Sequence, residues 1–148
     1  MMKINRQPFV MENLLSIKAV AKEETWFNGI IELKSYMLDE GLYQTGPVFF
    51  SVEEVEGEPT LKSFEYYLPI SWEIGLEEAE ISFVSSLELK DALVLRQADS
   101  AGEFTEAIEK IKKYAELEKI ELEKKAYCVC TEVYEEFIID IFMEIKGE

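Results

Sequence analysis

Two segments of this sequence place a carboxylate two residues before an aromatic ring in an otherwise apolar run. The first, FEYYLPI, holds Glu65 and Tyr67, and the second, FIIDIFMEI, holds Asp140 and Phe142. If both segments are β-strands, each acid shares a face with the ring that follows it, because side chains alternate between the two faces of a strand. A carboxylate beside aromatic rings attracts a positively charged ligand through its charge and through cation–π contact. The spacing therefore predicts a binding site for a small cationic or lipophilic molecule.

The other face of each segment is apolar, which predicts that it packs into the core. At an offset of 75 residues the two segments match, with acid and ring on one face and apolar side chains on the other. An unpaired carboxylate inside an apolar core would be strongly destabilising, so we expect Glu65 and Asp140 to point away from the core. The alternative is that this face is an ordinary solvent-exposed sheet surface. The expected core positions are Phe64, Tyr66, Leu68 and Ile70 in the first segment and Ile139, Ile141, Met143 and Ile145 in the second.

The elements that would hold these segments occur twice in the same order. Apolar spacing predicts a strand, a helix and two further strands in each half, and Gly41 is a suitable residue to end the first helix. Each element follows its counterpart after 75–79 residues, as when VFFSVEE is matched with YCVCTEV. An additional short strand is predicted at 80–86. The predicted ranges are 16–23, 26–40, 47–55 and 61–70 in the first half, and 91–97, 101–122, 125–133 and 135–145 in the second.

This duplicated pattern predicts an α+β fold built from two βαββ halves. An antiparallel sheet with two helices on one face would leave a groove on the other face, around a pseudo-twofold axis. We expect a single domain over residues 1–148. Its first half would span about 14–70 and its second half about 91–146, with a linker at 71–90.

The composition narrows the function classes. The chain has 31 acidic and 15 basic residues, a formal net charge of −16, which repels phosphate backbones and argues against nucleic acid as a partner. No apolar run approaches the roughly 20 residues that cross a bilayer, and the N-terminus has no signal-peptide core. We therefore expect a cytoplasmic protein with no membrane partner. The absence of histidine excludes Ser-His-Asp triads and His-containing metal sites.

The two cysteines and the glycine pattern point away from a cofactor. Cys128 and Cys130 are the only cysteines. Their spacing puts both on one face of a strand, which fits two buried thiols better than a disulfide or a metal site. The phosphate-binding glycine motifs GxGxxG and GxxxxGK(S/T) do not occur in the sequence. We therefore expect no metal and no cofactor.

The duplicated pattern resembles the GyrI-like small-molecule-binding domain, which is also the effector-binding domain of multidrug-sensing transcription regulators and shares the SOUL-type fold. The resemblance covers about residues 14–146, and it is carried by GPVFFSVEE, SFEYYLPI, ALVLRQADSAGEFTEAIEKI and EEFIIDIFMEI. It implies a ligand in the groove between the halves, contacted by an acid on the last strand. Asp140 takes that position, as an Asp where the family usually has a Glu. The chain also resembles uncharacterised small proteins of Gram-positive bacteria, some encoded beside polymorphic-toxin secretion genes.

We therefore predict a non-enzymatic protein that binds a small lipophilic or cationic molecule in the groove, to sense it or to sequester it. Trp26 falls close to the expected groove mouth and Trp72 follows Pro69 and Ile70 in the linker, so either could line a pocket, although a Trp at the end of an element is more often a packing residue. The alternative is an acidic protein-interaction module, such as an accessory or immunity-like partner of a toxin-secretion system. Acid–base hydrolysis by two carboxylates is the least favoured class, and a protein partner or a homodimer is left open. The candidate ligand contacts are Asp140, Glu65, Tyr67, Phe142, Trp26 and Trp72.

Overall fold

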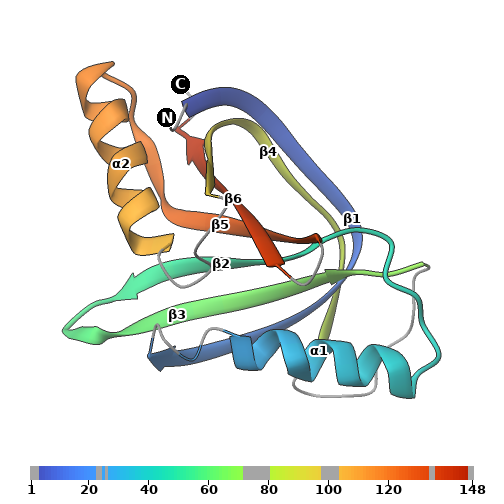
Figure 1. Ribbon diagram of the computed structural model, residues 1–148. Coiled ribbons are helices and arrows are strands. Elements are labelled where there is room, and N and C mark those ends of the chain that lie inside the picture. The colour runs from blue at the N-terminus through green and yellow to red at the C-terminus, as the bar shows by residue number, and fades with distance from the viewer. Residues whose placement is uncertain are drawn as a thin grey trace. The chain divides into compact units, whose positions relative to one another are not determined.

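The order of elements in the chain is βαββ followed by βαββ, as the computed structural model shows (Figure 1). The structure describes residues 4–22, 25, 27–71, 81–97, 104–133 and 136–146. Neither helix in this part of the chain is long and apolar enough to cross a membrane. The predicted α+β class and the repeated order of elements are confirmed. The elements are β1 (Ile4–Lys22), α1 (Phe27–Asp39), β2 (Val48–Val55), β3 (Glu58–Pro69), β4 (Ser82–Gln97), α2 (Phe104–Leu117), β5 (Leu122–Val133) and β6 (Glu136–Ile145).

The chain divides into two compact units, and each contains a helix and a set of antiparallel strands. In the first unit, Val10–Leu87, β1 and β2 both pair with β3. In the second unit, Met1–Phe9 with Glu88–Glu148, β4 and β5 both pair with β6. Helix α1 packs on β3, and α2 packs on β5 and β6. The last strand of each half is thus its central strand, and it is the strand that holds the predicted acid.

The strand register relates the two halves residue by residue. Lys18 lies opposite Glu65 in the pairing of β1 with β3. Arg96 lies opposite Asp140 in the pairing of β4 with β6. Each acid therefore has a basic residue as its direct neighbour on the adjacent strand, and the two basic residues are 78 positions apart.

The same register corrects the alignment of the third strand of the repeat. Phe49 lies opposite Tyr67 and Tyr127 lies opposite Phe142, so β5 follows β2 at an offset of 78 residues. The match of VFFSVEE with YCVCTEV uses an offset of 79 and is wrong by one residue. The correction matters because a shift of one residue exchanges the two faces of a strand.

Strands β1 and β4 are longer than predicted. The strand expected at 16–23 begins at Ile4, and those expected at 80–86 and 91–97 are one continuous strand. Much of the expected linker therefore belongs to β4. The stretch NRQPFVMEN lacks the alternation that indicates a strand, which hides the first part of β1 from sequence patterns. Within the second unit an exposed ion pair links that part to β4, where Arg6 Nε lies 3.0 and 2.9 Å from the two carboxylate oxygens of Asp91.

The two helices end in the same way, but only one end carries a sequence signal. Gly41 has a φ of 70°, and Leu42 N donates to Met37 O at 3.0 Å, so α1 ends where the glycine predicts. Helix α2 ends at Leu117 and not at residue 122. Lys119 adopts the left-handed conformation there, with a φ of 59°. A lysine in that role gives no pattern from which the end could be predicted.

The predicted core face of each central strand is buried. Only Ile145, at the end of β6, is half-buried rather than buried. The predicted core positions are thus buried, but burial alone does not separate the two faces, because Tyr67 and Phe142 on the other face are buried as well. The buried positions are Phe64, Tyr66, Leu68, Ile70, Ile139, Ile141 and Met143.

Tyr66 fits beneath α1 only because residue 29 is a glycine. A Cβ atom at Gly29 would lie 2.2 Å from Tyr66 Cε2, far closer than van der Waals contact allows. At the offset of 78 residues that relates the neighbouring strands, Gly29 corresponds to Ala107, and Tyr66 corresponds to Ile141 at the central-strand offset of 75. Both residues of the second half are buried. A ring facing a glycine in one half thus replaces an aliphatic side chain and an alanine in the other.

We expect Ile141→Ala to lower the free energy of unfolding by about 2–5 kcal/mol, because it deletes buried methyl groups and leaves a cavity. The measurement is urea-induced unfolding at equilibrium. The matched control is Ile31→Ala on α1, where the side chain is 51% exposed, against 0% for Ile141, so its cost should stay below about 1 kcal/mol. Equal costs at the two positions would contradict the assigned core face.

We expect Gly29→Ala to destabilise the protein, although the same change in an unobstructed helix raises stability by about 1 kcal/mol. The added methyl group would collide with the Tyr66 ring. Tyr66→Ile should remove that collision, so the double variant should be more stable than the sum of the two single changes predicts. A double-mutant cycle by urea unfolding measures this coupling, and additive effects would show that the two residues do not interfere.

Candidate functional site

The two aromatic rings predicted to contact a ligand are buried rather than open. Tyr67 is 4% exposed and stacks on Phe49, with ring centroids 4.8 Å apart. Phe142 is 5% exposed and packs against Phe9, also at 4.8 Å between centroids. Phe9 belongs to the part of β1 that sequence patterns do not reveal, so the covering of Phe142 could not be foreseen. A ligand could reach either ring only after neighbouring side chains had moved.

Asp140 is already paired with a cation of its own unit. Arg96 Nε lies 2.9 Å from Asp140 Oδ1, and Arg96 Nη2 lies 3.4 Å from Asp140 Oδ2. The side chain of Asp140 is 22% exposed and that of Arg96 is 70% exposed. The hydrogen bond to Asp140, together with the negative charge of Asp140, raises the pKa of Arg96. A cationic ligand at Asp140 would therefore have to compete with a guanidinium that is already in place.

Glu65 has a neutral partner instead. Ser16 Oγ donates a hydrogen bond to Glu65 Oε2 at 3.1 Å, and Ser16 is buried. Lys18 is the direct neighbour of Glu65 on β1, yet the ion pairs among the described residues do not join these two side chains. Val94, which has no hydroxyl group, takes the place of Ser16 in the second half. In the part of the chain that the structure describes, no ion pair therefore neutralises Glu65.

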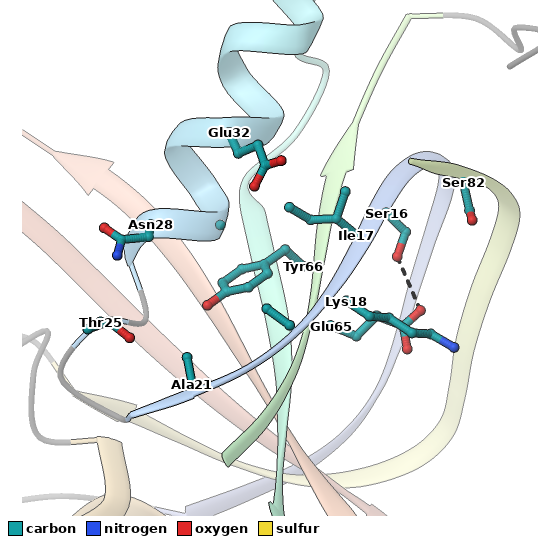
Figure 2. A pocket seen from close by; sticks show the side chains of 12 residues that line it. Ser16, Ile17, Lys18, Ala21, Thr25, Asn28, Glu32, Glu65, Tyr66 and Ser82 are labelled. Carbon is teal, nitrogen blue, oxygen red and sulfur yellow. Dashed lines mark hydrogen bonds between the residues drawn. The ribbon is translucent and has the colours of Figure 1, made fainter. Parts of the chain in front are cut away.

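Glu65 lines a pocket within the first unit that has a volume of about 570 Å³ (Figure 2). Consecutive residues from Ser16 to Ala19 line it. Because consecutive strand residues point to opposite faces, the lining includes residues from both faces of β1. Helix α1 borders the pocket, and Ser82 at the start of β4 lines it as well. The volume falls in the range of sites that hold small molecules.

The charged groups of the pocket favour a cation. Its lining contains two carboxylates, Glu32 and Glu65, and one ammonium group, Lys18, which leaves one negative charge in excess. Tyr66 lies on the opposite side of β3 from Glu65 (Figure 2). Burial raises the pKa of Tyr66 to about 12, so the phenol stays neutral at physiological pH and can donate a hydrogen bond. The pocket can therefore offer carboxylate charge together with a ring that has a neutral hydroxyl group.

Other predicted features lie elsewhere or outside the described residues. Trp26 and Trp72 belong to the residues that the structure does not describe, and the groove predicted between the two halves stays a prediction. Cys128 and Cys130 are buried free thiols. Among the residues with described positions, no group of three His, Cys, Asp or Glu side chains could hold a metal ion.

Sequence reasoning found Glu65 but missed the residues that surround it. Ser16 and Lys18 alternate with apolar residues in SIKAVAK, and this pattern shows that they share a face. It does not show which residue of β3 lies beside them, because register depends on long-range pairing. In the sequence, Gly29 is only a residue of low helix propensity. Its role becomes clear once Tyr66 is seen to pack against it.

The comparisons with known proteins bear on the fold. No protein-family model and no curated protein matches the chain. A crystal structure of the EcmrR C-terminal domain matches with a TM-score of 0.76 at 11% identity, covering 99% of each chain. EcmrR in a complex with DNA matches with a TM-score of 0.79 at 11% identity, and there the chain covers 58% of the length of EcmrR.

Two further structures share this architecture. A hydrolase from Listeria innocua has a TM-score of 0.65 at 10% identity, with 97% of this chain and 92% of that chain covered. SAV2435 bound to tetraphenylphosphonium has a TM-score of 0.52 at 13% identity, with 98% and 94% covered. At such identities the likeness establishes the fold alone. The chain has the fold of the EcmrR C-terminal domain, which is the fold that the resemblance to the GyrI-like domain predicts.

Proposed function

We propose that this protein binds a small organic cation, without chemical turnover, in the pocket beside Glu65. The observation that carries the proposal is the half-buried carboxylate of Glu65, which lines the cavity and has a serine hydroxyl as its hydrogen-bond partner. A carboxylate held by a neutral hydroxyl is not neutralised by that partner and can attract a cationic ligand. The structure of SAV2435 bound to tetraphenylphosphonium supports a lipophilic cation as the ligand class.

This proposal moves the principal ligand contact from Asp140 to Glu65. The resemblance places the acid on the last strand, and Asp140 occupies that position. Arg96 already neutralises Asp140 through two hydrogen bonds, so a ligand cation would gain little there. The two strands β3 and β6 are equivalent in the repeat. The position that the resemblance assigns to β6 therefore has a counterpart on β3, where the carboxylate has no competing cation bound to it.

A second candidate function is hydrolysis of the bound molecule. It is favoured by the structure of a Listeria innocua hydrolase with the same architecture and by a carboxylate that could act as a general base in the pocket. The pocket lining, however, contains no cysteine or histidine nucleophile. Hydrolysis would show as loss of a bound ester or amide over time, followed by chromatography, whereas binding alone would leave the molecule intact.

We expect the protein to bind methyltriphenylphosphonium more tightly than triphenylphosphine oxide, because the two share three phenyl rings and differ in charge. Glu65→Gln should weaken binding of the phosphonium by roughly 1.5–3 kcal/mol, the Coulomb attraction of two unit charges about 5–10 Å apart at an effective dielectric constant near 20. It should change binding of the neutral oxide much less. Isothermal titration calorimetry of both compounds with both proteins makes the comparison.

The matched control is Glu56→Gln, in the exposed turn between β2 and β3, which removes the same charge away from the pocket. It separates a local contact from the general field of a chain with a net charge of −16. If Glu65→Gln and Glu56→Gln weaken phosphonium binding equally, the attraction is only the field of the whole protein and the pocket proposal is wrong.

We expect Asp140→Asn to weaken phosphonium binding less than Glu65→Gln does. The reason is that this substitution removes a charge that Arg96 already balances. The same calorimetric titrations compare the two variants. A larger loss for Asp140→Asn would place the ligand at β6, as the resemblance implies, and would contradict the assignment of the site to Glu65.

A further inference from the structure

Each half of the chain places a basic residue directly beside its acid, but the two pairs differ in outcome. Arg96 lies opposite Asp140 and forms an ion pair with it. Lys18 lies opposite Glu65, at the equivalent position of the repeat, and lines the pocket. In Figure 2 the only interaction drawn to the Glu65 carboxylate comes from Ser16. The strand register thus places a basic residue beside an acid in both halves, but an ion pair between the two is seen only in the second half.

The chemistry of the two side chains explains this difference. A guanidinium is a rigid fork with several donors, and it matches the two oxygens of a carboxylate. An ammonium is a compact, strongly hydrated charge on a flexible stem, and it gives up such a pair more readily. In addition, the Ser16 hydroxyl already bonds one oxygen of Glu65. The first half therefore has a weaker internal cation and a neutral donor that keeps the carboxylate in position.

We propose that Lys18 is the specificity-determining residue of the pocket, an internal cation that competes with the ligand for Glu65. The inference rests on the proposed function. A ligand cation and the Lys18 ammonium repel each other, so the ligand binds by displacing Lys18 from the neighbourhood of Glu65. Because Lys18 competes only weakly for Glu65, a ligand cation can displace it. Arg96, at the equivalent position of the second half, is a strong competitor because it forms an ion pair with Asp140.

The proposal also names the charge of the ligand. With Glu32, Glu65 and Lys18 in its lining, the pocket holds one negative charge in excess, which suits a cation with a single positive charge. Without Lys18 the excess would be two charges, and a cation with two positive charges would gain relative to one with a single charge. Lys18 is therefore expected to set selectivity between monocations and dications.

The test uses two opposite substitutions in the full chain. Lys18→Arg should reproduce the Arg96–Asp140 pair in the first half and close the site, with about a tenfold loss of affinity for methyltriphenylphosphonium, the size expected for a close charge pair. Lys18→Met should open the site and raise that affinity several-fold. It should also favour the dication 1,1′-dimethyl-4,4′-bipyridinium over the monocation. Isothermal titration calorimetry measures both compounds.

The matched controls are Lys22→Arg and Lys22→Met, on the same strand but outside the pocket lining. They carry the same changes in shape and net charge and should leave phosphonium affinity within about twofold of wild type, as expected for exposed charges screened by salt. Melting temperatures confirm that every variant is folded. The outcome that overturns the inference is a wild-type protein that prefers the phosphonium over the oxide while the Lys18 variants behave like their Lys22 controls. No preference in the wild type would instead overturn the proposed function.

Discussion

A carboxylate that is only partly exposed needs a partner, and the site in this protein depends on how each half meets that need. In the second half the partner is the Arg96 guanidinium, which neutralises Asp140. In the first half the partner is the Ser16 hydroxyl, which holds Glu65 without neutralising it. The backbone register is the same in both halves, so the difference comes from side chains alone. The acid of the second half is neutralised by a cation of the chain itself, whereas the acid of the first half can still attract a ligand cation.

A second difference between the halves falls at the same place. The first unit packs the Tyr66 ring against Gly29, where the second unit has Ile141 and Ala107. Tyr66 and Gly29 both line the pocket that Glu65 lines. The charge difference and the packing difference thus coincide around one cavity. The first unit therefore differs from the second both in charge and in packing around the pocket, whereas the second has an apolar and charge-balanced version of the same arrangement.

The sequence was sufficient for the fold because its signals are local and periodic. Alternation in the central strands indicated the core face, the near-constant offset indicated the repeat, and Gly41 indicated the end of α1. Sequence patterns did not predict the features that depend on residues far apart in the chain or that lack a characteristic residue type. The first part of β1 is polar and is held by Arg6 on Asp91, and Lys119 ends α2 without a glycine. For the site, alternation separated both acids from the core positions, but only the side-chain contacts show that Asp140 forms an ion pair with its basic neighbour.

Transfer of a binding residue by position is ambiguous in a chain with an internal repeat. A rule that assigns the ligand to an acid on the last strand selects Asp140, yet the repeat makes Glu65 its equivalent. Position alone cannot choose between them, because both lie on a central strand with a basic neighbour in register. Charge can choose, because a carboxylate that is already neutralised gains little from a second cation, whereas one held by a hydroxyl keeps its full attraction. The overall charge of −16 attracts cations to the protein in general, and the proposed site is at Glu65 because the ion pairs among the described residues do not include this carboxylate.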